Sequence, residues 1–246
     1  MGSVGNSDAF ECMRCEMQKV ALVFFLFIAM YARGEVAPRI AKAARDFVPP
    51  GYVVAEAIKG DLNKDHQADE IFIIKATNKN NFVKHEYRGL LDRNRRGLIV
   101  ALKRGDQYEL ALENLNCFSS ENEDGGVYFP PELSVKVERG NLRLHYAHGR
   151  YGFWVYTFRY QNSVFELIGY DSSDNSGPVV DRLVSINFLT KKMLMRENVN
   201  SVEVRGLGRS KFKETTTTFV FPKLIQLRSI SDIDELDVES LLAPSR

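Results

Sequence analysis

The stretch that decides the fold is LSVKVERGNLRLHYAHGRYGFWVYTFRYQNSVFELIGY, residues 133–170. Apolar and polar residues alternate along much of it, which is typical of strands with one buried face. The turn-forming groups Arg139-Gly140-Asn141 and Gln161-Asn162-Ser163 interrupt the pattern and indicate hairpins. The stretch therefore predicts a run of antiparallel strands at Leu133–Val137, Leu142–Tyr146, Phe153–Tyr160 and Val164–Tyr170.

The same pattern continues on both sides of this stretch. Further short strands, several of them joined by tight turns such as 103–106, are predicted at Tyr52–Ile58, Glu70–Lys75, Gly97–Leu102, Tyr108–Leu112, Leu183–Phe188, Met193–Glu197 and Thr216–Phe221. Many short strands with frequent hairpins indicate an all-β fold, in which antiparallel hairpins form a sandwich or a propeller-like sheet.

Short helices are predicted at the two ends of this β-rich region. Near the N-terminus, apolar residues recur with helical spacing at Ile40, Ala44, Phe47 and Val48. Near the C-terminus, Ser231–Leu242 resembles a short helix that Ser231 caps, with Asp234 three residues later. No long linker divides the chain after residue 34, so residues 35–246 are predicted to form a single domain.

The composition excludes some classes of protein. The 246 residues carry a formal net charge of +1, so no basic surplus points to nucleic acid. Cys117 is the only cysteine after residue 34, which leaves no partner for an internal disulfide. A lone cysteine of this kind is more often buried by packing than used as a nucleophile.

The N-terminal region resembles a secretory signal peptide. Val20–Tyr31 is apolar and uncharged, and it is too short for a membrane-spanning helix of about 20 residues. Lys19 precedes the run and Ala32-Arg33-Gly34 follows it as a small-x-small cleavage site. Residues 1–34 are therefore expected to be an upstream extension plus a signal peptide whose translation starts at Met17. The alternative is an uncleaved membrane anchor.

The clearest chemical motif is the loop GDLNKDHQAD at Gly60–Asp69. Asp61, Asn63, Asp65 and Asp69 place oxygen side chains at alternating positions, and the carbonyl of Gln67 supplies another oxygen. Calcium takes six to eight oxygen ligands, so this pattern predicts a structural Ca²⁺ site. The spacing differs from an EF-hand and is similar to the DxDxDGxxD loops of FG-GAP and VCBS-type β proteins.

One position departs from those loops. His66 stands where they have the glycine that reaches a positive φ, and a non-glycine residue there costs on the order of 1 kcal/mol. The loop is therefore expected to bind calcium more weakly than its relatives. The alternative is an Asx-rich turn that is held by its own side-chain hydrogen bonds.

Three other motifs are weaker. His145 and His148 have an H-x-x-H spacing, but on a strand that runs into a turn the two side chains point to opposite faces. The aromatic strand Phe153–Tyr160 favours a buried core strand with Trp154 inside, the alternative being an aromatic platform for a sugar or peptide. Gly206–Lys211 lacks the context of a phosphate-binding loop.

Several segments together resemble a known group of sequences. They are the Gly60–Asp69 loop, Phe158-Arg159-Tyr160-Gln161-Asn162, Leu167-Ile168-Gly169-Tyr170 and Asn187-Phe188-Leu189-Thr190. The chain is similar to bacterial exported proteins that carry a GDLNKDG-type loop and an FRYQN…LIGY…NFLT signature. The resemblance implies a periplasmic or secreted location and supports the calcium loop, but it assigns no catalytic residue. His66 and Ala147-His148 depart from the pattern.

We expect an exported cell-envelope protein, a calcium-stabilised binding or interaction domain whose partner is an envelope protein or a glycan. No nucleic-acid partner and no stable membrane span after signal cleavage are expected. The alternative is an envelope hydrolase that acts on a glycan or peptide. A binding role is favoured over an enzyme, because no catalytic residue can be assigned and the sequence has no G-x-S-x-G motif.

Overall fold

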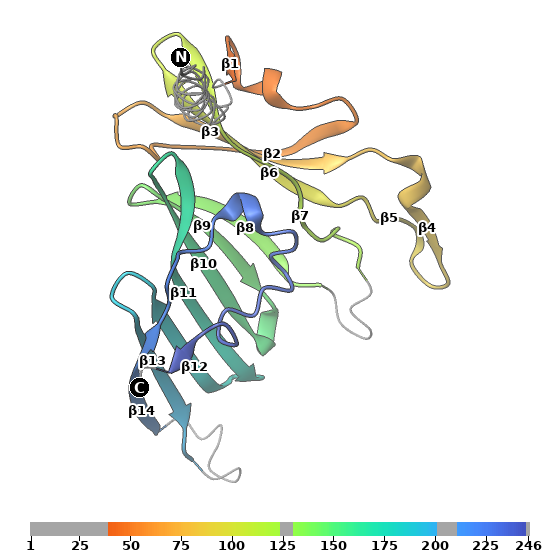
Figure 1. Ribbon diagram of the computed structural model, residues 1–246. Helices are drawn as coiled ribbons and strands as arrows, with labels where there is room; N and C mark the ends of the chain where they lie inside the picture. The colour runs from red at the N-terminus through yellow and green to blue at the C-terminus, as the bar shows by residue number, and fades with distance from the viewer. Residues whose placement is uncertain (1–38, 124–129, 201–210, 245–246) are drawn as a thin grey trace, which may run out of the picture. The chain divides into compact units, whose positions relative to one another are not determined.

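A computed structural model describes residues 39–123, 130–200 and 211–244, which belong to one compact unit, Arg39–Arg246. Strands dominate the described residues, and they form antiparallel sheets that do not close into a barrel (Figure 1). The all-β, sandwich-like fold predicted from the sequence is confirmed. The expected signal peptide and upstream extension, 1–34, lie outside the described residues.

The N-terminal half forms a five-stranded sheet in the order β1-β7-β6-β3-β2. Its strands are β1 (Ile40–Ala41), β2 (Tyr52–Gly60), β3 (Asp69–Ala76), β6 (Arg96–Arg104) and β7 (Gln107–Phe118). A separate hairpin, β4 (Phe82–His85) and β5 (Gly89–Asp92), leaves this sheet between β3 and β6.

The C-terminal half forms an eight-stranded sheet in which neighbours in sequence are neighbours in space, from β8 at one edge to β15 at the other. Every pairing is antiparallel. The strands are β8 (Glu132–Glu138), β9 (Asn141–Ala147), β10 (Gly152–Gln161), β11 (Val164–Ser176), β12 (Val179–Asn187), β13 (Lys192–Asn198), β14 (Phe212–Val220) and β15 (Ala243–Pro244).

The turns of this sheet follow from their residues. Arg139 and Gly140 join β8 to β9 with φ of 53° and 72°, and Asn162 and Ser163 join β10 to β11 with φ of 53° and 59°. Two-residue hairpin loops need this left-handed backbone because it matches the twist of the strands. The two hairpins predicted from these residues are confirmed.

The main core lies between the two large sheets. Buried side chains from both meet in it, including Leu98 of β6, Leu142 of β9 and Phe158 of β10. Cys117 is also fully buried there, and burial raises the pKa of its thiol to about 12, as expected for a packing residue.

The apolar run of β3 is explained by a second, smaller core. Ile71 and Ile73 face the main core, whereas Phe72 and Ile74 pack on the opposite side of the sheet with Ala44 and Phe47. A strand that is covered on both faces is apolar at successive positions.

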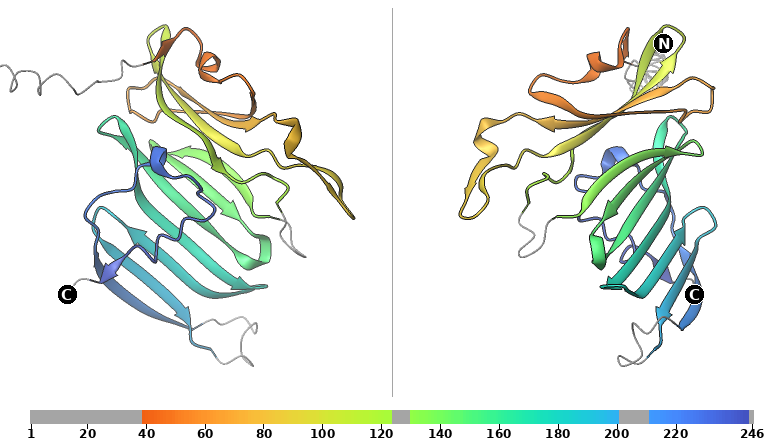
Figure 2. Two further views of the ribbon diagram at one scale, coloured as in Figure 1. Left: turned by 45° about the vertical axis from the view of Figure 1, so that its right-hand side comes forward. Right: turned by 180° about the vertical axis from the view of Figure 1, so that it is seen from behind.

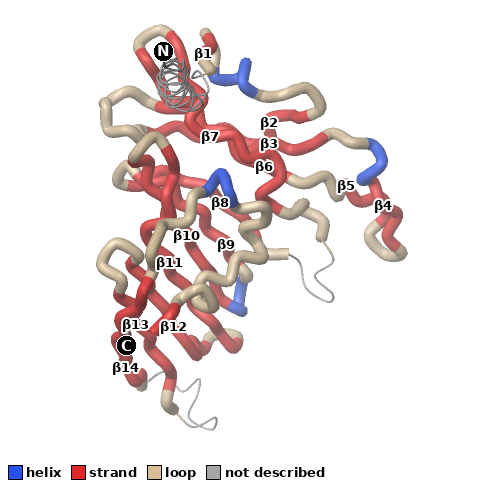
Figure 3. The backbone as a smooth tube through the Cα atoms, viewed as in Figure 1, coloured by secondary structure: helices blue, strands red, loops and turns tan. Residues whose placement is uncertain are grey.

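The two ends of the region are less helical than the sequence predicted. At the N-terminal end the chain forms β1 and then the single 3-10 turn η1 (Ala44–Phe47). The other short helical turns are η2 (Lys79–Asn81), η3 (Gly149–Tyr151) and η4 (Leu227–Ser229) (Figure 3).

The predicted helix at Ser231–Leu242 is wrong, because these residues form bends and turns. Figure 2 shows the segment crossing one face of the eight-stranded sheet. Ile233 donates its backbone N–H to the carbonyl of Cys117 (2.9 Å), and Tyr156 donates its hydroxyl to the carbonyl of Leu236 (2.8 Å). These partners outside the segment replace the internal hydrogen bonds of a helix.

The aromatic strand β10 is largely a core strand, as the sequence favoured. Tyr156 and Phe158 are buried in the main core, and Phe153 on the opposite face is 37% exposed. Trp154 is only half-buried, although it packs against the same core. Trp154, at the N-terminal end of this aromatic face, is therefore partly accessible to solvent.

Candidate functional site

The predicted calcium loop joins the ends of two neighbouring strands. β2 ends at Gly60, β3 begins at Asp69, and the two residues pair in the ladder. A side chain at Gly60 would place its Cβ 2.4 Å from that of Val137 in β8, so only glycine lets the hairpin approach that strand. The loop is thereby fixed against the larger sheet.

Inside the loop, side-chain oxygens turn towards backbone N–H groups. Asp61 accepts hydrogen bonds from the N–H groups of Asp65 (3.1 Å) and His66 (3.0 Å). Asn63 accepts one from Asp65 (3.0 Å), and Asp65 accepts one from Gln67 (2.9 Å). Three of the predicted ligands, Asp61, Asn63 and Asp65, are thus directed to the inside of one turn.

The backbone of the loop is left-handed at two residues. Lys64 has a φ of 63° and His66 a φ of 66°. The positive φ that the sequence predicted for position 66 is confirmed, and it is occupied by histidine. Such a conformation is unfavourable for residues with a Cβ.

We expect His66→Gly to raise the free energy of unfolding by about 1 kcal/mol, because glycine reaches this φ without steric cost. His66 is exposed, so the substitution removes no core contact. Urea denaturation of both proteins measures the difference. Unchanged or lower stability of the variant would contradict the strain at this residue.

Asp69 differs from the other acidic residues because it is buried. One of its carboxylate oxygens accepts the N–H of Leu62 (2.7 Å), and the other accepts the N–H of Lys103 (2.9 Å). Burial raises the pKa of Asp69, and the charges of Asp65 and Asp61 raise it further. Asp69 therefore connects the loop to the β6–β7 turn.

The β6–β7 turn also supplies a positive charge to the loop. Arg104 lies 3.3 Å from a carboxylate oxygen of Asp65, and the side-chain oxygen of Gln67 accepts the N–H of Gly105 (3.2 Å). The N–H of Gln67, together with Asn63 and Arg104, lowers the pKa of Asp65. Arg104 would compete with a cation for this carboxylate.

These contacts define how the loop could hold a metal. Within the described ranges, no three His, Cys, Asp or Glu residues gather as a group that could hold a metal ion. A calcium ion in the loop would therefore draw on Asp61 and Asp65, the amide oxygen of Asn63, the carbonyl of Gln67 and water. Neutral oxygens of these kinds are ordinary calcium ligands, and such a site is a weak one.

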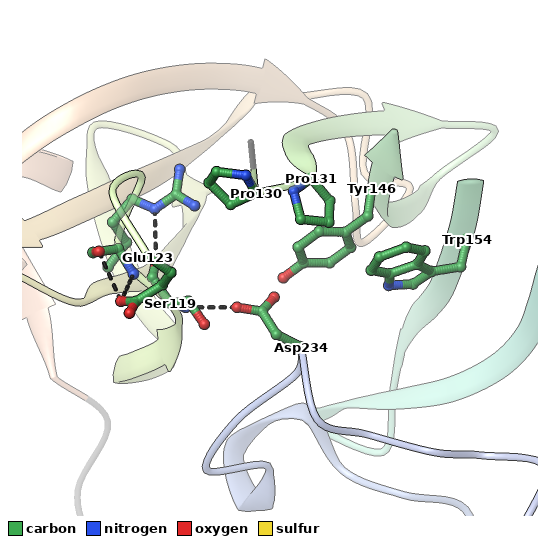
Figure 4. A pocket seen from close by; sticks show the side chains of 9 residues that line it. Ser119, Glu123, Pro130, Pro131, Tyr146, Trp154 and Asp234 are labelled. Carbon is green, nitrogen blue, oxygen red and sulfur yellow. Dashed lines mark hydrogen bonds between the residues drawn. The ribbon is translucent and has the colours of Figure 1, made fainter. Parts of the chain in front are cut away.

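A second candidate site is a pocket of about 240 Å³ that the sequence did not predict (Figure 4). It combines residues that lie far apart in sequence, among them Arg96, Glu123, Pro131, Tyr146, Trp154 and Asp234. Tyr146 is 2% exposed, and its ring stacks on that of Trp154 at a centroid distance of 5.2 Å. The Tyr146 hydroxyl points towards the carboxylate of Asp234 (Figure 4).

The carboxylates that line this pocket accept hydrogen bonds from the 119–120 segment. One oxygen of Asp234 accepts the N–H of Ser119 (2.8 Å), and Glu123 accepts both the N–H and the hydroxyl of Ser120. The Tyr146 hydroxyl and Asp234 Oδ1 are both buried, and the two side chains face each other (Figure 4). Burial raises the pKa of Tyr146, and the charge of Asp234 and its hydrogen bond with the Tyr146 hydroxyl raise it further.

Only some of the residues that line this pocket could be recognised from the sequence. The aromatic-platform alternative for 153–160 included Trp154, which does line the pocket. Asp234 was interpreted as a capping residue of a helix that does not form. Its position in the pocket depends on the long-range contact between Ile233 and Cys117, which no local pattern encodes.

Of the remaining motifs, the H-x-x-H pair lies within the described residues. His145 packs against Phe153 and His148 against Tyr151, and within the described residues neither belongs to a group of three His, Cys, Asp or Glu side chains that could hold a metal ion. Burial, with Lys136 and Arg143, lowers the pKa of His145. Most of the glycine-containing segment at 206–211 lies outside the described residues.

Comparisons with protein-family models, with curated proteins and with solved structures found no match to this chain. The part of the chain that the structure describes contains no helix that is long and apolar enough to cross a membrane.

Proposed function

We propose that the protein is an exported binding domain of the cell envelope in which the Asp61–Asp69 loop binds calcium as a structural ion. The observation that carries the calcium proposal is the inward direction of the Asp61, Asn63 and Asp65 oxygens within one left-handed turn. Bound calcium would offset the charges of two carboxylates and stabilise the turn between β2 and β3.

The export proposal is supported by the N-terminal sequence and by the resemblance to bacterial exported proteins. The apolar run Val20–Tyr31, with Lys19 before it and Ala32-Arg33-Gly34 after it, has the layout of a signal peptide. Extracellular calcium sites can be weak, with a Kd of about 10⁻⁴–10⁻³ M. An exported location thus suits a loop that contains His66 and whose Asp65 is paired with Arg104 of β6.

A binding role is supported by the exposed apolar side chains of one hairpin. Phe82 and Val83 on β4 and Leu90 on β5 are exposed, as is Tyr87 in the turn between these strands. Phe82 and Leu90 lie on one face of the hairpin and Val83 on the other. Exposed apolar side chains are one feature of interaction sites.

The hydrolase alternative has less support. In the pocket, Glu123 already accepts hydrogen bonds from Ser120, and the Asp234 side chain accepts the N–H of Ser119 and hydrogen-bonds Tyr146. A glycoside hydrolase needs two carboxyl groups that act on one bond. The pocket therefore favours binding of a ligand over its cleavage.

We expect 10 mM Ca²⁺ to raise the melting temperature by about 3–6 °C relative to chelator. A tenfold excess over a Kd of about 1 mM contributes about 1.4 kcal/mol, and 1 kcal/mol shifts the midpoint of a chain of this size by about 2–4 °C. Differential scanning calorimetry measures the shift. Mg²⁺ should have a smaller effect, because it requires a tighter octahedral site.

Two variants serve as controls for this experiment. Asp65→Ala should fold but lose the calcium-dependent shift, since it removes an inward carboxylate from a partly exposed loop. Arg104→Gln should increase the shift, because the competing charge is removed. Equal melting temperatures of the wild type in calcium and in chelator would show that the loop is only an Asx-rich turn.

A further inference from the structure

We propose that the β4–β5 hairpin is a peripheral membrane anchor whose tip inserts into the headgroup region of an anionic phospholipid bilayer. The inference rests on the proposed binding role in the cell envelope, and it names the partner and the residues that meet it. It does not depend on calcium in the loop.

Exposed apolar side chains are concentrated on this hairpin. Among the described residues, eleven large apolar side chains are exposed, and four of them, Phe82, Val83, Tyr87 and Leu90, lie within one hairpin. Tyr87 is 84% exposed and Leu90 is 69% exposed, the two highest values of the eleven. The hairpin is a two-stranded sheet of its own, and Figures 1 and 2 show it extending away from the five-stranded sheet. Single exposed apolar residues are normal, whereas such a concentration indicates a contact surface.

The arrangement of these side chains favours a bilayer over a protein partner. Phe82 and Leu90 share one face of the hairpin, Val83 lies on the other face, and Tyr87 lies in the turn. A protein surface that receives a hairpin covers mainly one of its faces. A membrane interface surrounds an inserted tip on all sides, so apolar residues on both faces and in the turn are buried together.

The charges of the hairpin complement an anionic surface. Residues 79–90 carry more positive than negative side chains: the positive ones are Lys79, Lys84 and Arg88, and the negative one is Glu86. Asp92, at the base of the hairpin, is already paired with Lys75 at 3.0 Å. A lysine or arginine close to an anionic membrane strengthens binding about fivefold, so this surplus favours anionic lipids over neutral ones.

The order of these groups along the hairpin fits a shallow insertion. Tyr87 lies in the turn, and Lys84 and Leu90 pair directly opposite each other behind it. Phe82 lies two residues, about 7 Å, further back on β4. Apolar groups of interfacial proteins lie about 5–10 Å deep at the boundary between headgroups and acyl chains. Tyr87 and Leu90 therefore reach this boundary, while the long side chain of Lys84 extends its ammonium group back to the phosphates.

The backbone of the turn is prepared for such an environment. Nδ1 of His85 accepts the N–H groups of Tyr87 and Arg88, both at 3.2 Å. Backbone N–H groups without a partner are unfavourable away from water, so these two hydrogen bonds lower the cost of insertion. They also fix the turn that presents Tyr87, and a tip that is already ordered loses little entropy when it binds.

A tryptophan placed in the turn tests the insertion. The full chain contains the apolar run Val20–Tyr31, which can itself bind lipid, so the reporter has to lie on the hairpin. With vesicles of 25% phosphatidylglycerol in phosphatidylcholine, Tyr87→Trp should show a saturable blue shift of its emission and quenching by brominated acyl chains. The matched control is Leu189→Trp, at an exposed position between β12 and β13, which should show neither change. Trp154, the only native tryptophan, contributes the same background to both variants.

Further substitutions in the Tyr87→Trp variant test the lipid class and the residues. Lys84→Gln should weaken partition into the anionic vesicles about fivefold, and Glu86→Gln should strengthen it by a similar factor. Leu90→Ser should weaken it about tenfold without lowering the melting temperature, because Leu90 is exposed in the protein. Vesicles of phosphatidylcholine alone should bind the tip at least tenfold more weakly, and 0.5 M NaCl should weaken binding to the anionic vesicles.

Four results would overturn the inference. They are the absence of a lipid-dependent shift in Tyr87→Trp, an equal response in Leu189→Trp, equal binding to neutral and anionic vesicles, and a blue shift that grows with protein concentration without lipid. The last result would show that the hairpin contacts a second copy of the chain. If the tip does not respond to lipid while calcium still raises the melting temperature, the membrane anchor is wrong and the calcium proposal stands. If the tip inserts while calcium has no effect, the anchor stands without the calcium site.

Discussion

Replacing Phe158 by alanine should lower the free energy of unfolding by about 3–5 kcal/mol. Phe158 is fully buried in the main core, on a strand in the interior of the eight-stranded sheet. Truncating a buried phenylalanine removes its transfer free energy and leaves a cavity that close-packed neighbours fill only partly. Urea denaturation monitored by circular dichroism measures the change.

The matched control is Phe153→Ala on the same strand. Phe153 lies on the opposite face of β10 and is 37% exposed, so its truncation should cost about 1 kcal/mol or less. Similar losses for the two variants would mean that the assignment of the core face is wrong. The pair therefore tests which face of β10 is packed in the core.

Gly152→Ala is expected to have a comparable effect for a different reason. Gly152 has a φ of 115°, and a Cβ there would lie 1.7 Å from the backbone carbonyl oxygen of Ser173 in β11. Either the backbone of β10 or that of β11 has to move, at the point where β10 leads to Trp154. We expect a loss of about 3–5 kcal/mol from this overlap and from the unfavourable φ together.

Gly149→Ala is a control for a left-handed φ without steric overlap, whereas Gly152, with a φ of 115° and a ψ of −154°, lies in a region that only glycine readily adopts. Gly149 also has a positive φ, 52°, but nothing lies within 4 Å of an added Cβ. Its substitution should therefore cost only about 1–2 kcal/mol, the conformational part alone. Thermal and urea denaturation of both variants give the comparison, and an equal loss in the two would contradict the close approach of Gly152 to Ser173.

The fold was predictable where it depends on local patterns. Turn residues such as Asn162 and alternating side chains identified the hairpins, because both act over a few residues. The segment 231–242 was not predictable, since Cys117 and Tyr156 of distant strands hold it through hydrogen bonds with Ile233 and Leu236. Local helix signals such as Ser231 and Asp234 were overridden by those contacts.

The candidate sites also combine features that local sequence patterns predict with features that depend on long-range contacts. The inward oxygens of the loop and the positive φ of His66 follow from the spacing of Asp61–Asp69. The approach of Arg104 to Asp65 depends on the pairing of β3 with β6. The pocket needs Tyr146, Trp154 and Asp234 together, and only the folded chain brings them into contact.

Equilibrium dialysis against 2 mM CaCl₂ tests the central proposal most directly. With a Kd of about 10⁻⁴–10⁻³ M, about 0.7–0.95 calcium ions should be bound per wild-type chain, and Asp65→Ala should bind almost none. Atomic absorption of both sides of the membrane gives the ratio. Binding of less than 0.1 calcium ion per folded wild-type chain, or equal binding by the two proteins, would contradict a calcium site in the Asp61–Asp69 loop.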